Sequence, residues 1–141
     1  MNREEIKKIM PHREPMLLLD TVEVDAETGR AIGKYRVTGE EFFVQGHFPG
    51  NPIVPGVIQC EMIAQTICAL LPQTAEGETV PMYAGLNNVK FKNPLVPGDV
   101  ATMTVEIVNK KSIFYFAKGT LKANDKLCTS AEFSIAIVPK K

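Results

Sequence analysis

Residues 46–65 read GHFPGNPIVPGVIQCEMIAQ, a turn-rich segment that leads into an apolar helix. Glycines and prolines crowd residues 39–55 and predict an irregular but ordered loop. Pro55 suits the first turn of the helix, where a missing N–H costs nothing. From residue 47 to residue 75, His47 and Glu61 are the two groups suited to acid–base catalysis near neutral pH. Ionisable groups in so apolar a segment are costly unless they are paired or functional, so we take them as a candidate catalytic pair.

The composition indicates one soluble globular domain that spans residues 1–141. Its apolar fraction is 45%, its charged fraction is 23%, and its formal net charge is zero. A neutral chain has no overall attraction for nucleic acid or for an anionic membrane. Acidic residues occupy the N-terminus, where a secretory signal would place a basic stub, and no apolar run is long enough to span a bilayer. We expect a cytoplasmic protein.

The three cysteines are expected to be small core residues. Cys60 and Cys68 lie eight residues apart on one helix, about 12 Å at helical rise, too far for a disulfide. With Cys128 the count is odd, which suits a reducing compartment. His12 and His47 lack the spacing of metal ligands, so no metal site is expected.

The remaining pattern predicts mainly strands. A short helix capped by Asn2 is followed by prolines, and a polar loop is expected at residues 73–79. Turns are expected at residues 27–29, at Lys110-Lys111 and at Asn124-Asp125. The expected strands are residues 16–25, 31–38, 82–92, 100–109, 113–123 and 127–138, with the long helix at residues 55–71.

A long helix without a charged face must be surrounded. The order β-β-α-β-β-β-β therefore predicts an α+β fold in which one antiparallel sheet curls around the buried helix. A second copy of the chain would cover what the sheet leaves exposed, so we expect at least a dimer.

His47 and Glu61 suit a proton transfer beside a carbonyl group. An imidazole can accept a proton at cellular pH, and burial favours the neutral, proton-donating form of a carboxyl. Gln65, one turn after Glu61, can hold the carboxyl by a hydrogen bond. Gly56 lies where a helix N-terminus offers free N–H groups to an oxyanion. A structural role for His47 and a flexible helix entry at Gly56 are the plainer alternatives.

The chain resembles the beta-hydroxyacyl-acyl-carrier-protein dehydratases of bacterial-type fatty-acid synthesis, which have the hot-dog fold. The most specific feature is Gly-His-Phe-Pro with a carboxylate fourteen residues after the histidine. The residues that carry the resemblance are Pro11-His12-Arg13, Pro15, Leu17-Leu18, Asp20, Phe42-Phe43, Gly46-His47-Phe48-Pro49, Pro52, Pro55-Gly56-Val57, Glu61, Ala64-Gln65, Gly85, Asn88-Val89, Lys90-Phe91-Lys92 and Pro97-Gly98-Asp99.

The resemblance implies an activity and a site. His47 would remove the alpha proton of a (3R)-hydroxyacyl thioester, and Glu61 of the opposite subunit would protonate the departing hydroxyl to give the trans-2-enoyl thioester. Gly56 would donate its N–H to the thioester carbonyl, and Gln65 would orient Glu61. The family commonly forms trimers of dimers and needs no metal or organic cofactor.

The resemblance also implies the way in which the substrate arrives. It would be carried on the phosphopantetheine arm of an acidic acyl carrier protein, for which Arg13, Lys90 and Lys92 are docking candidates, although solvated surface charges are an equal alternative. Phe48 and Val57 are candidates for lining the acyl tunnel.

Three departures and three alternatives stay open. Met62, Val54 and Asn87 replace residues that are more frequent in the family, which leaves tunnel shape and chain length undetermined. A dehydratase that also converts the trans-2 product to the cis-3 isomer is one alternative, although Glu61 in place of aspartate favours simple dehydration. A hot-dog acyl thioesterase and a non-enzymatic acyl-binding module are the others.

Overall fold

The computed structural model describes residues 1–72 and 79–140 and contains two helices and six strands in that part of the chain. The polar loop expected at residues 73–79 lies outside the described residues except for Thr79. No helix in the described ranges is long and apolar enough to cross a membrane. The elements are α1 (Arg3–Ile6), β1 (Thr21–Asp25), β2 (Arg30–Arg36), α2 (Gly56–Cys68), β3 (Thr79–Phe91), β4 (Val100–Lys111), β5 (Phe114–Ala123) and β6 (Lys126–Pro139).

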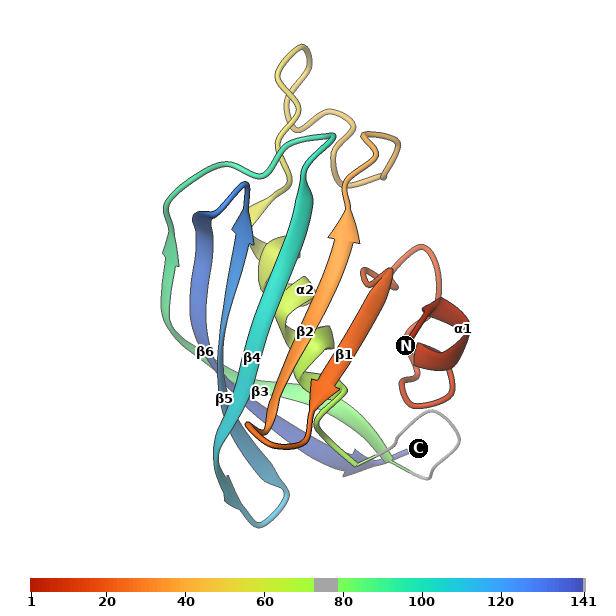
Figure 1. Cartoon of the computed structure of the whole chain (residues 1–141), viewed down its shortest axis with the longest axis vertical. Helices are drawn as coiled ribbons and strands as arrows, with labels where there is room; N and C mark the ends of the chain where they lie inside the picture. Colours follow the sequence, from red (N-terminus) through yellow and green to blue (C-terminus); the bar gives the residue numbers. More distant parts are fainter. Residues whose placement is uncertain (73–78, 141) are drawn as a thin grey trace.

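The strands form one antiparallel sheet in the order β1-β2-β4-β5-β6-β3. Figure 1 shows the sheet curving around α2, while α1 lies beside β1 at one edge. The α+β class and the curled sheet around one long helix are therefore as predicted. β3 forms the other edge, because it pairs with β6 and with no further strand among the described residues.

α2 fits closely against the sheet because small residues face it. A Cβ added to Gly119 on β5 would collide with Ile63 of α2 and would lie 2.8 Å from Val105 on β4. Ile63 and Ile67 are completely buried. The close approach of helix and sheet therefore depends on a missing side chain, as is usual where backbones come near each other.

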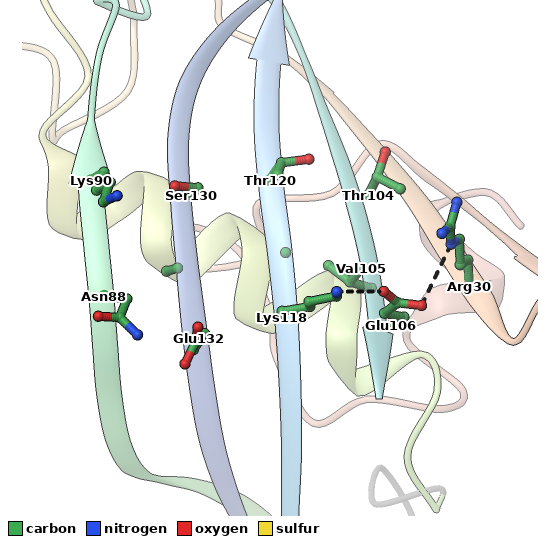
Figure 2. Close-up of a pocket in the computed structure, with 12 residues that line it drawn as sticks. Arg30, Asn88, Lys90, Thr104, Val105, Glu106, Lys118, Thr120, Ser130 and Glu132 are labelled. Atoms are coloured by element: carbon green, nitrogen blue, oxygen red, sulfur yellow. Dashed lines mark ion pairs between the residues drawn. The ribbon is translucent and has the colours of Figure 1, made fainter. Parts of the chain in front are cut away.

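The outer face of the sheet carries a cross-strand charge ladder, formed by Arg30, Glu106, Lys118 and Glu132. Each residue lies directly opposite the next on the neighbouring strand. The Arg30 Nε and Lys118 Nζ atoms lie 3.6 and 3.2 Å from the Glu106 carboxylate (Figure 2). Opposite charges at directly paired positions favour this register of the strands.

The first predicted strand was too long. Residues 16–20 are not in a strand, and β1 begins at Thr21. The Leu18 N–H donates to the Gln65 side chain instead of to a neighbouring strand, and Leu17, Leu18 and Leu19 are buried in the core. An apolar run can thus belong to the core without forming a strand, because here the buried Gln65 side-chain amide hydrogen-bonds to the backbone of the run.

One predicted turn was displaced. β4 continues through Lys110 and Lys111, and the two-residue turn lies at Ser112 and Ile113, where Ser112 has φ of 57°. The turn at Asn124-Asp125 is confirmed, with φ of 54° and 61°. Positive φ at both positions is typical of the type I′ hairpin turn.

Candidate active site

The loop that carries His47 is held by its own backbone. The Phe48 N–H donates to the Asn51 carbonyl at 3.0 Å, the Asn51 N–H donates to the Phe48 carbonyl at 2.9 Å, and the Ile53 N–H donates to the His47 carbonyl at 2.7 Å. Gly46 precedes His47 with φ of 84°, in the left-handed region that glycine adopts without strain. The loop is therefore an ordered support, as predicted.

The His47 ring is fixed in one orientation. Its Nδ1 lies 3.0 Å from the Ile53 carbonyl oxygen, and the ring stacks on Phe48 with 4.3 Å between the centroids. A carbonyl oxygen can only accept a hydrogen bond, so Nδ1 carries a hydrogen, and in the neutral ring Nε2 holds the lone pair. This tautomer leaves Nε2 able to take a proton.

His47 borders a hollow of about 540 Å³ at the start of α2. Gly56, Val57, Phe91 and Lys92 also line it. The N–H groups of Gly56 and Val57 have no hydrogen-bond partner among the described residues. A hydrogen-bond acceptor that entered the hollow would meet these free N–H groups and the positive end of the helix dipole.

Gly56 is required by a neighbour that sequence reasoning missed. A Cβ at this position would lie 2.7 Å from the ring of Phe91. The space beside the Cα is thus filled by an aromatic ring. The N–H of Gly56 nevertheless has no hydrogen-bond partner in residues 1–72 and 79–140.

Glu61 lies at the centre of a polar group that we call the Glu61 cluster: Glu61, Gln65, Tyr83 and His12. Gln65 Nε2 donates to Glu61 Oε2 at 3.0 Å, and the Tyr83 hydroxyl donates to Oε1 at 2.9 Å. His12 Nε2 lies 3.7 Å from Oε2. The Glu61 side chain is 19% exposed, so its carboxyl is largely shielded from water.

Gln65 is itself locked in place. The side chain is completely buried, Nε2 also donates to the Met16 carbonyl at 2.7 Å, and Oε1 accepts from the Leu18 N–H at 2.8 Å. If the amide were turned over, its oxygen would face the Met16 carbonyl oxygen and the Glu61 carboxylate oxygen, and neither contact could be a hydrogen bond. The hydrogen bond that the sequence predicted from Gln65 to Glu61 is present and runs in only one direction.

Sequence reasoning missed His12 and Tyr83 as members of the Glu61 cluster. Burial lowers the pKa of His12, although the Glu61 charge opposes the shift, and its Nδ1 is buried with no hydrogen-bond partner among the described residues. The Pro11-His12-Arg13 motif was a signal for His12. No local sequence pattern marks Tyr83. It lies 22 residues after Glu61 in the sequence and comes close to it because β3 packs near α2.

Within one chain, His47 and Glu61 border different hollows. Glu61 lines a space of about 380 Å³ with Tyr83, Cys60 and Leu86, whereas His47 lines the space at the helix start. Val57 borders both spaces and is 75% exposed. The two candidate residues thus flank one exposed apolar side chain without contacting each other among the described residues.

The other candidate residues occupy three different settings. The Arg13 guanidinium donates to the carbonyls of Lys7, Met10 and His12, so it serves the backbone after α1. Lys90 lines a separate hollow on the outer face of the sheet (Figure 2). Lys92 borders the His47 hollow. Phe48 is 53% exposed beside His47.

The three cysteines are buried and form no disulfide among themselves. In residues 1–72 and 79–140, no three His, Cys, Asp or Glu side chains gather closely enough to hold a metal ion.

Comparison with solved structures shows the fold. The dehydratase heterocomplex ApeI:P from Xenorhabdus doucetiae matches with a TM-score of 0.79 at 18% identity and covers 96% of this chain and 91% of that chain. The E. coli PaaI protein matches with a TM-score of 0.60 at 14% identity over 77% of this chain and 76% of its own. The profile of the ApeI-like family, described as ApeI dehydratase, matches residues 23–132. The molecule is therefore a hot-dog-fold protein of the dehydratase class.

Curated relatives narrow the class. The 3-hydroxyacyl-[acyl-carrier-protein] dehydratase FabZ of Clostridium beijerinckii is 41% identical over 97% of this chain and 99% of its own. FabZ of Clostridium perfringens is 40% identical over 97% and 99%, and FabZ of Caulobacter vibrioides is 40% identical over 95% and 86%. The chain belongs to the FabZ family of 3-hydroxyacyl-[acyl-carrier-protein] dehydratases.

Proposed function

We propose that the protein dehydrates (3R)-hydroxyacyl thioesters, carried on acyl carrier protein, to trans-2-enoyl thioesters during fatty-acid elongation. Family membership supports the reaction type. The observation that carries the residue assignment is the hydrogen bond from His47 Nδ1 to the Ile53 carbonyl. In the neutral ring it directs the lone pair to Nε2, in the same hollow as helix N–H groups that have no partner among the described residues.

His47 and Glu61 have complementary tasks in this reaction. His47 Nε2 takes the proton from C2 of the acyl chain, and the electron pair of that bond forms the C2–C3 double bond. The C3–O bond breaks as Glu61 gives its proton to the departing hydroxyl, which leaves as water. Proton transfers by positioned groups of this kind contribute about 10²- to 10⁴-fold to rate.

The start of α2 supplies the third element of the site. Loss of the C2 proton moves negative charge onto the thioester oxygen, and an N–H that already lacks a partner can stabilise it without rearrangement. The Gly56 N–H is our candidate donor. Gln65 orients Glu61, and Phe48 and Val57 line the entrance for the acyl chain.

His47 and Glu61 would meet across two subunits. The β3 edge exposes large apolar side chains, with Met82 54% exposed, Leu86 45% and Phe91 55%, next to the exposed Val57. A second copy that pairs along β3 would cover this surface and set His47 of one protomer against Glu61 of the other. We propose this homodimer as the catalytic unit, with a trimer of dimers as the full assembly.

Lys92 is the favoured docking residue for the acidic carrier protein. It borders the His47 hollow, so an anionic carrier bound there would deliver its phosphopantetheine arm to the base. Arg13 is used by backbone carbonyls and Lys90 lines the outer face, so neither receives comparable support. No metal or organic cofactor takes part in the proposed reaction.

The test uses the purified protein with (3R)-hydroxyacyl carrier protein of several chain lengths. Mass analysis should show loss of water, and chromatography should show the trans-2 isomer. His47→Ala and Glu61→Gln should each lower turnover by at least about 10² while the fold persists.

The matched control is Glu132→Gln, which makes the same change on the outer face and should leave turnover near wild type. Release of free thiol without loss of water would instead identify a thioesterase. A cis-3 product would identify the isomerase variant, and wild-type turnover in both active-site variants would overturn the residue assignment.

A further inference from the structure

The Tyr83 hydroxyl has two hydrogen-bond acceptors within reach. Its oxygen lies 2.9 Å from Glu61 Oε1 and 3.4 Å from the Cys60 carbonyl oxygen. Burial raises the pKa of the Tyr83 phenol, and the Glu61 charge raises it further, so the phenol keeps its proton near neutral pH. A neutral hydroxyl can donate one hydrogen bond and accept others, and its hydrogen can rotate between the two acceptors.

The other oxygen of the Glu61 carboxyl, Oε2, can only accept a hydrogen bond from its neighbour Gln65. Gln65 Nε2 donates to Oε2 and cannot exchange its oxygen and nitrogen, because the Met16 carbonyl and the Leu18 N–H hold the side chain in this orientation. A proton on Oε2 would point at this donor or at His12 Nε2, which at 3.7 Å lies beyond hydrogen-bond distance. The proton of a neutral Glu61 therefore belongs on Oε1, where the Tyr83 oxygen can accept it.

Tyr83 consequently suits both protonation states of Glu61. Beside the carboxylate, the hydroxyl donates to Oε1. Beside the neutral acid, Oε1–H donates to the Tyr83 oxygen, and the hydroxyl hydrogen turns to the Cys60 carbonyl. The Glu61 Oε1 atom and the Tyr83 hydroxyl thus keep a hydrogen-bond partner in either state.

We propose that Tyr83 is a positioning residue that keeps the exchangeable proton of Glu61 on Oε1 and provides a hydrogen-bond partner before and after this proton is given away. The inference rests on the proposed function, in which Glu61 is the proton donor. The titratable groups that face Glu61 are His12 from the segment after α1, Tyr83 from β3, and Cys60 and Cys68 from α2 itself. Tyr83 is the one within hydrogen-bond distance in the described part of the chain.

The test is Tyr83→Phe, which removes one oxygen and leaves the ring in contact with Phe133. We expect turnover to fall about tenfold with KM within about twofold, because the hydroxyl acts on Glu61 and not on substrate binding. A carboxylate loses a stronger hydrogen bond than a neutral acid does, so the basic limb of the pH–rate profile should move up by roughly half to one pH unit. Tyr115→Phe, a hydroxyl removed from β5 without such a partner, should change neither.

A second measurement needs no substrate. Carbon NMR of the Glu61 side-chain carboxyl follows its titration directly, and its midpoint should lie at higher pH in Tyr83→Phe than in wild type. An unchanged midpoint and an unchanged pH profile in a variant that still dehydrates would overturn the role of Tyr83 and leave the proposed function intact. If the Glu61 titration midpoint shifts but the protein does not dehydrate any substrate, the proposed function is wrong, while the hydrogen-bonding role of Tyr83 is supported.

Discussion

At the scale of single residues, the candidate site depends on side chains whose hydrogen bonds leave no freedom. Gln65 uses both hydrogens of its amide and its oxygen, and His47 uses Nδ1. Removal of such a partner costs the full desolvation of the groups left behind, typically about 1–3 kcal/mol. The orientation of both candidate catalytic side chains is thus set by hydrogen bonds to their neighbours.

His12 should make stability depend on pH. Its folded pKa lies below the ordinary value of 6.5, because burial disfavours the charged ring. As pH falls below 6.5, the unfolded chain binds a proton that the folded chain does not, so the free energy of unfolding decreases. The loss is absent above 6.5 and grows until the folded pKa is reached.

Urea unfolding between about pH 7.5 and about pH 5.5 measures this effect. We expect His12→Asn to show a smaller decrease over this window than wild type. Ordinary carboxylates titrate mostly below it, near pH 4, so they add little. Equal slopes for the two proteins would contradict the prediction.

At the scale of the elements, α2 was the part most readily predicted. Its uninterrupted apolar composition predicted burial, and Pro55 marked its start. The helix ends at Cys68, three residues before the predicted end at Leu71. The strands from β3 to β6 were also placed nearly correctly, because alternation and turn residues are local signals. The segment before β1 was misread, because its apolar run satisfies its backbone through Gln65, 47 residues away from Leu18.

The contact between α2 and β5 gives a prediction about stability. Gly119→Ala places a methyl group against Ile63 and Val105, and overpacking of this kind typically costs about 1–3 kcal/mol. Gly85→Ala is the matched control on β3, because its Cβ would lie 3.7 Å from Ser134, an ordinary contact. Chemical denaturation should show a lower midpoint for the first variant alone, and equal midpoints would refute the close contact.

At the scale of the whole molecule, the site could be foreseen only in part. His47, Glu61 and Gln65 stand out in one short segment, so local chemistry was enough to name them. Tyr83 and Phe91 come to α2 from β3 through the fold, and nothing near them in sequence marks that contact. The separation of His47 from Glu61 within one chain is likewise a property of the assembled sheet and helix.

The proposed two-subunit site predicts complementation. We expect His47→Ala and Glu61→Gln each to be nearly inactive, whereas in the proposed dimer a mixed pair would have one site with both native residues. Random exchange in an equal mixture should restore about a quarter of wild-type turnover, as expected for a two-fold symmetric dimer with two sites. Turnover should rise as subunits exchange, and a mixture that stays inactive after proven exchange would place both residues in the same subunit.

The charge ladder on the outer face also limits where a charged partner can be drawn. Its two cations and two carboxylates alternate from strand to strand, so their fields cancel within a few ångströms of the surface (Figure 2). The ladder itself therefore offers no net attraction to the acidic carrier proposed above. If the acidic carrier proposed above docks at Lys92, which borders the His47 hollow, the charge ladder on the outer face should not compete for it.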